Sequence, residues 1–119
     1  YIHSRGIVHC DIKPGNLMLG SDASEPSRVR FIDFALCRPY KNLDTAEHLP
    51  DKGTSHFLGS RLFISLNGHL HHSSSRRDDI EAMSYTLLAL VVSRLPWKAR
   101  LQRRPSSRRL CDLKKQWSG

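Results

Sequence analysis

The strongest hydrophobic pattern in the chain lies at residues 76–93. Apolar side chains occur there on nearly every helical face, at Ile80, Met83, Leu87, Leu88, Leu90, Val91 and Val92. The preceding Ser75-Arg-Arg-Asp78 has the S-x-x-D form of a helix start, with the serine as cap. A helix that is apolar all round is typical of a buried one. We therefore predict a central buried helix over residues 76–93, with Pro96 closing the element.

The first third of the chain carries short apolar runs typical of strands. Residues 1–5 read as the last turn of a helix, ended by Gly6. Strands are predicted at 7–8, 17–19 and 29–32, and the last of these runs leads directly into Asp33. Acidic residues near the ends of neighbouring strands can meet in one cleft. Residues 36–72, by contrast, show no sustained hydrophobic periodicity of the helical or the strand type. A long irregular segment in a compact domain is usually functional or disordered.

Composition limits the class of protein. With 119 residues, 39% hydrophobic and 25% charged, the chain suits one small globular domain. No apolar run reaches the ~20 residues of a membrane span. The N-terminus has neither a starting Met nor a signal-peptide layout, so the sequence reads as an interior piece of a longer protein. Three widely spaced cysteines without a C-x-x-C pair favour free thiols and an intracellular location, in the cytoplasm or nucleus.

The net charge of +8 is concentrated at the C-terminal end. Residues 1–93 contain ten Lys/Arg and ten Asp/Glu, whereas residues 94–119 contain nine Lys/Arg and only Asp112. We predict a disordered basic tail over 99–119. An alternative is a nucleic-acid or acidic-lipid binder, whose affinity would fall steeply with salt and vanish without that tail.

The segment His9–Asn16 brings together three residue types that phosphoryl transfer requires. Asp11 can accept a proton, Lys13 can neutralise an anion, and the Asn16 amide oxygen can hold a hard cation. Asp33, which follows Asp11 by 22 residues in Asp33-Phe34-Ala35, supplies a second carboxylate behind a β-prone run.

This combination of H-x-D-I-K-P-x-N with D-F-x resembles the C-terminal lobe of eukaryotic protein kinases. Further segments make the resemblance closest to the casein kinase 1 family of serine/threonine kinases, over residues 1–98. They are YIHSRGIVH (1–9), KPGN (13–16), FIDF (31–34), SLN (65–67), SRRDDIEAMSY (75–85) and LPW (95–97).

The resemblance implies a mainly α-helical large lobe with short strands around a catalytic loop at 6–20. It also implies a metal loop at 33–35 and an activation segment at 36–67, in which 59–67 forms a shelf for the substrate peptide. By this resemblance Asp11 is the catalytic base and Lys13 neutralises the transferred phosphoryl group of ATP. Asn16 and Asp33 hold two Mg²⁺ ions. His9 and Asp79 support the loop, with Asp79 bonded to its backbone.

Several residues depart from the family pattern. Cys10 replaces an arginine that binds the activation segment, and Leu62 stands where a basic residue is usual. Gly15 adds backbone freedom beside Asn16, and Ala35 replaces the glycine of D-F-G. These changes leave the base and the metal ligands in place but indicate relaxed constraint on the other positions of the kinase motifs.

The sequence also has no glycine-rich loop and no strand lysine for the nucleotide phosphates. It therefore predicts a fragment without the small lobe, inactive by itself because the nucleotide is left uncovered. The alternative is a non-catalytic kinase-like module that binds partners. His69, His71 and His72 form an H-x-H-H string, which we interpret as a solvated loop rather than a metal site because no Cys or carboxylate completes it.

Overall fold

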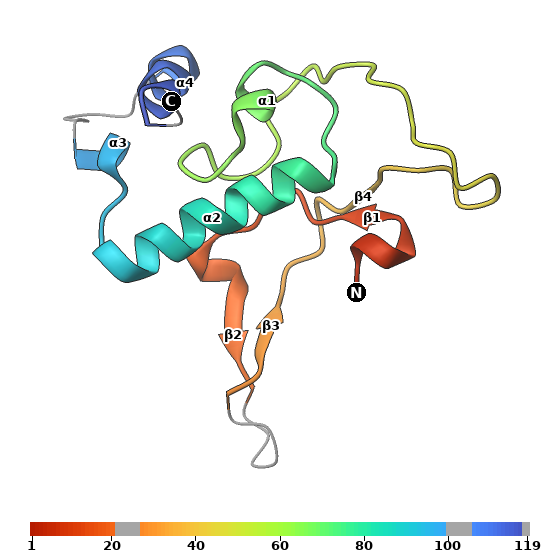
Figure 1. The fold of residues 1–119 in the computed structure, drawn as a ribbon, viewed down its shortest axis with the longest axis horizontal. Coiled ribbons are helices and arrows are strands. Elements are labelled where there is room, and N and C mark those ends of the chain that lie inside the picture. Colours follow the sequence, from red (N-terminus) through yellow and green to blue (C-terminus); the bar gives the residue numbers. More distant parts are fainter. Residues whose placement is uncertain (21–26, 100–105, 118–119) are drawn as a thin grey trace.

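A computed structural model describes residues 1–20, 27–99 and 106–117 of the chain. Helix α2 (Arg76–Val92) crosses the middle of the molecule, as Figure 1 shows. A hairpin of strands lies below it in this view, and the shorter helices α1 (Leu66–His69) and α4 (Ser107–Lys115) lie above it. Helix α3 (Pro96–Ala99) follows α2 at the other end of the molecule from the N-terminus.

Two small antiparallel sheets occupy the first third of the chain. Strand β1 (Ile7–Val8) pairs with β4 (Arg38–Pro39), and β2 (Leu17–Leu19) pairs with β3 (Val29–Phe31). The 3-10 turn η1 (His3–Arg5) ends at Gly6, which adopts the left-handed conformation with φ of 80°. A second turn, η2 (Pro14–Asn16), leads directly into β2. The predicted helical turn and all three predicted strands are therefore present, with β3 ending one residue early.

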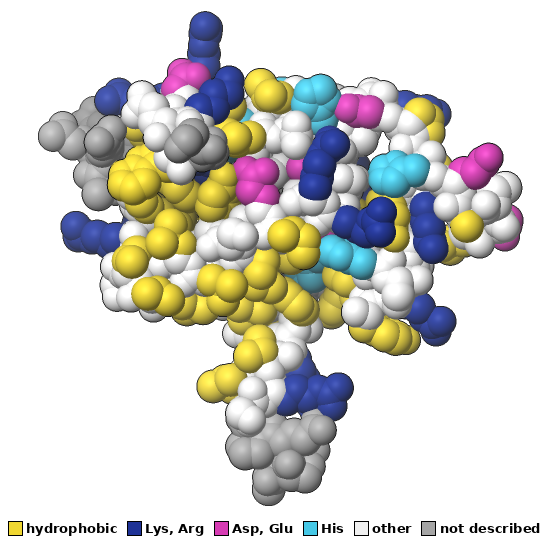
Figure 2. All heavy atoms as spheres, in the orientation of Figure 1, with side chains coloured by type: hydrophobic (Ala, Val, Ile, Leu, Met, Phe, Trp, Pro, Cys, Tyr) yellow, Lys and Arg dark blue, Asp and Glu magenta, His cyan; other side chains and the backbone are white. Residues whose placement is uncertain are grey.

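Helix α2 begins as predicted but is not buried on all sides. Ser75 and Asp78 form a reciprocal capping box, in which each side chain bonds the other residue's backbone N–H. The buried side chains of the helix are Asp78, Asp79, Ala82 and Thr86, so the covered face is largely polar. Apolar residues on other faces stay exposed, including Leu90 (58%) and Val91 (82%). They contribute to a hydrophobic surface along the molecule (Figure 2).

The expectation of an all-round buried helix was wrong because α2 packs through its polar N-terminal face and through only part of its apolar surface, at Tyr85, Leu88 and Ala89. Its N-terminal carboxylates face the segment around His9 and the start of α1, where they accept backbone and hydroxyl hydrogen bonds. Hydrophobic periodicity could not reveal this, since it records only where apolar residues lie. It does not record which face meets a polar neighbour.

The expectation of a disordered tail is contradicted at residues 107–115, which form helix α4. Ser106 caps this helix by accepting a hydrogen bond from the Arg109 backbone N–H. Leu110 (1% exposed) packs with Leu95 and Trp97 in the main hydrophobic cluster. Leu110 and Leu113 form an apolar stripe that packs on the core. This packing stabilises the helix despite the basic composition of the segment. Residues 100–105 of the predicted tail lie outside the described residues.

Strand β4 lies within residues 36–72, where no strand was predicted. The rest of this range is mostly irregular, as predicted. Its described regular features are one isolated bridge between Lys41 and His48 and the short helix α1 at its end. Among the described residues, no helix has the length and apolar character needed to cross a membrane. Cys10, Cys37 and Cys111 are all free, as expected.

Candidate active site

Asp11, Lys13 and Asn16 converge on one carboxylate. Oδ2 of Asp11 accepts hydrogen bonds from Lys13 Nζ at 2.5 Å and from Asn16 Nδ2 at 3.1 Å. Asn16 Nδ2 also donates to the Asp11 main-chain carbonyl at 2.8 Å. Asp11 and Asn16 are both buried, with 7% and 5% of their surface exposed. The turn η2, started by Pro14, reverses the chain between the three residues and thereby brings them together.

Helix α2 holds the loop that carries Asp11. The Asp79 carboxylate accepts hydrogen bonds from the backbone N–H groups of His9 (2.8 Å) and Cys10 (3.0 Å). Asp79 Oδ2 also lies 2.8 Å from Nε2 of His3. These bonds fix a backbone in which Cys10 has a φ of 67°, a conformation that non-glycine residues seldom adopt. The predicted bonding of Asp79 to the loop backbone is thus present in the structure.

His9 is buried and links the loop to the segment before Asp33. Its ring contacts the rings of Phe31 and Phe34 in tilted arrangements, with centroid distances of 5.6 and 5.2 Å. Nε2 of His9 lies 3.2 Å from the Ile32 carbonyl, and Nδ1 accepts a hydrogen bond from the Asp11 backbone N–H. His9 therefore connects the Asp11 loop with the segment around Asp33.

Asp33 stands beside the loop, at an exposed position. Ile32, the residue before it, donates its backbone N–H to the Asn16 carbonyl at 3.0 Å, which places the two segments side by side. The Asp33 backbone has a φ of 62°, and among the described residues its Oδ1 accepts one long hydrogen bond of 3.4 Å, from the Ala35 N–H. Positive φ therefore occurs at the aspartate and not at Ala35.

Residues 59–60, distant in the sequence, also contact Asp11. Ser60 donates its backbone N–H to Asp11 Oδ1 at 2.9 Å. Gly59 precedes it with a φ of +83°, and a Cβ at this glycine would lie 2.3 Å from the Cys10 carbonyl oxygen. Only a residue without a side chain permits this approach. The contact from Ser60 was not predicted, although Gly59 was a sequence signal for a close backbone approach.

The shelf segment, residues 59–67, is attached to α2 by polar side chains. Ser65 donates its hydroxyl to Asp78 Oδ1 at 2.6 Å. Leu66 donates its backbone N–H to Glu81 Oε1 at 2.8 Å, and the Tyr85 hydroxyl bonds the same oxygen. Helix α2 therefore positions both the Asp11 loop and the segment that faces it.

Charge and hydrogen bonding keep the Asp11 carboxylate ionised. Burial acts to raise its pKa, but the hydrogen bonds from Lys13 and Ser60 and the Lys13 charge act against it. Their sum holds the Asp11 pKa below its ordinary value. Burial raises the pKa of the neighbouring Cys10 thiol to about 11, so at neutral pH this group is uncharged.

The oxygen donors at the site suit a hard divalent cation. Asn16 uses its amide nitrogen on Asp11, which leaves the amide oxygen as its remaining polar atom. Asp33 adds an exposed carboxylate with one weak hydrogen bond. Carboxylate and amide oxygens are ligands that Mg²⁺ prefers. Within the part of the chain that the structure describes, no three His, Cys, Asp or Glu residues cluster at metal-binding distance.

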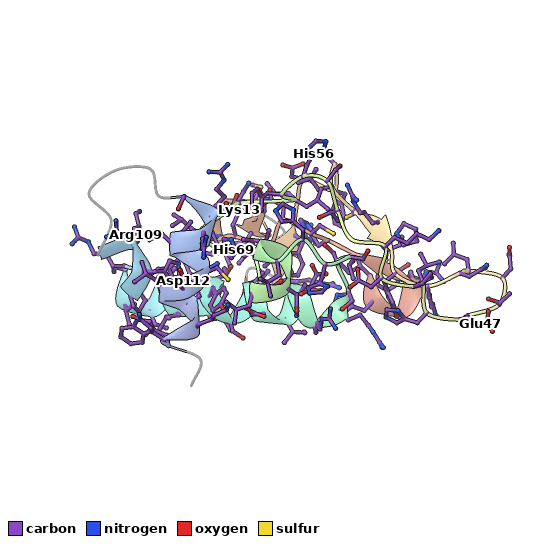
Figure 3. The ribbon with its side chains drawn as sticks, turned by 90° about the horizontal axis from the view of Figure 1, so that it is seen from above. Lys13, Glu47, His56, His69, Arg109 and Asp112 are labelled. Carbon is purple, nitrogen blue, oxygen red and sulfur yellow. The ribbon has the colours of Figure 1, made fainter. Side chains whose placement is uncertain are left out.

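The H-x-H-H string does not converge on one point. His69 is buried in α1, whereas His72 Nδ1 pairs with Asp51 Oδ2 at 2.7 Å on the surface. Figure 3 shows His69 near the middle of the molecule.

A comparison with known families agrees with this geometry. The family model described as the protein kinase domain matches residues 1–117. The chain belongs to the protein kinase family. Enzymes of this family transfer a phosphoryl group from ATP to protein hydroxyls with the help of Mg²⁺. The match includes the described helix α4, so the basic C-terminal segment belongs to the kinase region rather than to a separate tail.

Proposed function

We propose that this kinase segment serves phosphoryl transfer from ATP to serine and threonine hydroxyls of proteins, in the manner of the casein kinase 1 family. The observation that carries the proposal is the Asp11 carboxylate, held between Lys13, Asn16 and the Ser60 amide. The Ser/Thr class rests on the resemblance of the SLN and SRRDDIEAMSY segments. Three free cysteines support an intracellular setting.

Each residue at the site has a role that follows from its chemistry. Asp11 accepts the proton of the attacking hydroxyl, since its depressed pKa keeps it ionised. Lys13 neutralises the charge of the phosphoryl group as it moves between oxygens. Asn16 and Asp33 would hold Mg²⁺, which shields the phosphate charges when it is bound. His9 and Asp79 keep the loop in place.

We further propose that residues 1–119 by themselves do not turn over ATP. None of these residues forms a glycine-rich loop over the phosphates or a strand lysine that pairs them. Asp33 is exposed, so metal and phosphate would be left in contact with water. Calorimetric titration of the 119-residue chain with MgATP is expected to show no stoichiometric binding. Clear one-to-one binding would contradict this part of the proposal.

Phosphotransfer is tested with the natural gene product that contains these residues. It is assayed with labelled ATP on serine, threonine and tyrosine versions of one peptide. Transfer to the first two is expected, and Asp11→Asn should reduce it at least about 100-fold, the usual effect of losing a general base. Asp44→Asn, at an exposed position of the activation segment, is the matched control and should retain activity.

A second candidate is a non-catalytic kinase-like module that binds other proteins. It is favoured by the exposed apolar residues of α2 and by the departures at Cys10 and Ala35. Absence of transfer by the natural product, together with an unchanged fold of Asp11→Asn, would support this candidate over the enzyme.

A further inference from the structure

We propose that Lys114 is a positioning residue for Asp11, acting through the backbone of residues 60–64. The inference rests on the proposed role of Asp11. Lys114 lies in helix α4, far from Asp11 in the sequence. Figure 3 shows α4, marked by Arg109 and Asp112, beside His69 of α1.

Lys114 is an almost fully buried lysine, with 1% of its surface exposed. Its Nζ donates hydrogen bonds to the main-chain carbonyls of Arg61 (3.3 Å) and Ile64. The same nitrogen lies 3.2 Å from Nε2 of His69. Aromatic rings complete the site, with Tyr85 and Trp97 centroids 4.8 and 5.4 Å from Nζ. A lysine is rarely buried in this way unless its ammonium or amine has a specific partner set.

A continuous path of hydrogen bonds leads from Lys114 to the candidate base. Lys114 Nζ holds the Ile64 carbonyl, and the Ile64 N–H donates to the Ser60 carbonyl at 3.0 Å. The Ser60 N–H then donates to Asp11 Oδ1 at 2.9 Å. Because Ser60 is bonded at both its N–H and its carbonyl, a shift of the Ile64 backbone must move or weaken the bond to Asp11.

Lys114 can hold this backbone in two ways that differ in one proton. The ammonium has three N–H donors, enough for both carbonyls and for Nε2 of His69. In that state the His69 proton lies on Nδ1, a buried atom to which none of the described residues offers a hydrogen bond. The neutral amine has two N–H donors and a lone pair. It can therefore accept a hydrogen bond from a protonated Nε2 of His69, and Nδ1 of His69 then carries no proton. The hydrogen bonds that Lys114 Nζ makes with the Arg61 and Ile64 carbonyls and with His69 therefore differ between its two protonation states.

Burial of Lys114 places the exchange between these states near neutral pH. Burial is the main effect on Lys114 and lowers its pKa to about 7, while Glu81 and Cys111 act in the opposite direction. Burial, followed by the Lys114 charge, lowers the pKa of His69 to about 4, so His69 stays neutral. Arg61, Glu81, His69, Tyr85 and Cys111 are the titratable groups that face the amine or its partners. The pKa of Lys114, lowered to about 7, lies in the neutral range.

The test is an NMR titration of the full 119-residue chain from about pH 5.5 to about pH 9. It follows the Ser60 amide proton, the Lys114 ¹³Cε and the histidine rings. Lys114→Met removes the amine at similar volume. Lys115→Met, at the next and exposed position of α4, is the matched control. No nucleotide is needed, so this result and the phosphotransfer result can fail independently.

The proposal predicts that Ser60 and Lys114 titrate with the same midpoint in the wild type and in Lys115→Met. In Lys114→Met the step at Ser60 should disappear, and hydrogen exchange of the Ser60 amide should accelerate about tenfold. A folded Lys114→Met with the wild-type Ser60 shift, exchange rate and pH profile would overturn the proposal. If this variant does not fold, the wild-type titration still tests the proposal. A Ser60 amide shift that does not change with pH, or that titrates with a histidine instead of Lys114, would contradict the proposal.

Discussion

At the residue scale, the site depends on backbone positions with positive φ, a conformation that is costly for any residue other than glycine. Cys10, Asp33 and Gly59 all have positive φ, and all three lie within or beside the group that surrounds Asp11. Asp79 offsets this cost at Cys10 by accepting two backbone hydrogen bonds. The geometry of Asp11 therefore reflects its neighbours' backbones as much as its own side-chain partners.

Gly59→Ala should disrupt the site, because the new Cβ would meet the Cys10 carbonyl at 2.3 Å and the φ of +83° disfavours alanine. We expect a loss of about 2 kcal/mol or more in unfolding free energy and a weakened Ser60–Asp11 hydrogen bond. Urea denaturation and the Ser60 amide shift measure the two effects.

Gly15→Ala is the control for this change, since no atom lies within 4 Å of the point where its Cβ would stand and its φ is not positive. It should change stability by less than about 1 kcal/mol. Equal losses for the two alanines would show that the close approach at Gly59 is not important.

Stability should rise with pH between about 7 and 9 because of Lys114. Its pKa is about 7 in the fold and 10.5 ordinarily, so the unfolded chain binds more protons in this window. The gain should be on the order of 1–2 kcal/mol and absent in Lys114→Met. Above about pH 9 the raised pKa of Cys10, about 11, opposes it.

His69 gives the corresponding effect on the acid side. The His69 pKa is about 4 in the fold and 6.5 ordinarily, so the imidazole of the unfolded chain takes up its proton first as the pH falls. The unfolding free energy should therefore decrease as the pH falls from about 6.5 to about 4. Chemical denaturation at a series of pH values measures both slopes. A flat profile from pH 7 to pH 9 in the wild type would contradict the burial of a lysine.

At the element scale, α2 organises the fold through its polar residues and α4 completes the core. Asp79 binds the Asp11 loop, and Asp78 and Glu81 both bind the shelf segment, whereas much of the apolar surface of α2 remains uncovered. Trp97, after α2, donates its indole N–H to the Leu62 carbonyl and contacts Leu110 of α4. Helix α4 is thus connected to the shelf segment by both apolar and polar contacts.

Leu110→Ala should lower the unfolding free energy by about 2–4 kcal/mol, because it empties a buried position. Leu90→Ala, at a site 58% exposed on α2, is the matched control and should cost less than about 1 kcal/mol. Denaturation monitored by Trp97 fluorescence compares them. A Leu110→Ala variant as stable as the wild type would indicate that residues 107–115 do not pack on the core.

The sequence allowed some of these elements to be predicted and not others. The string from His9 to Asn16 and the S-x-x-D cap at Ser75 have local causes, so turns, strands and helix start could be predicted from neighbouring residues. Helix α4 was missed because its arginines dominate the composition, although Ser106 and the Leu110–Leu113 spacing mark it. The Ser60 and Lys114 contacts join residues 49 to 53 positions apart, which no local pattern records.

At the scale of the whole molecule, the described residues form one network around α2. The Asp11 loop and the shelf segment each bond to its N-terminal half, and α4 reaches the shelf from the opposite side. The net charge of +8 is distributed unevenly, but Lys114 shows that part of the basic C-terminal segment is structural. The family match through residue 117 agrees with this extent.

The proposed phosphotransfer depends above all on Asn16 and Asp33 forming a divalent-metal site next to Asp11. Paramagnetic Mn²⁺, added to the ¹⁵N-labelled chain in small steps, tests this site by NMR line broadening. We expect early and selective broadening at Asn16, Asp33 and their neighbours, removed by Asp33→Asn and competed by Mg²⁺. Asp44→Asn should leave it unchanged. Broadening that begins at His71 and His72 or spreads evenly over acidic surfaces would contradict a metal site at Asn16 and Asp33.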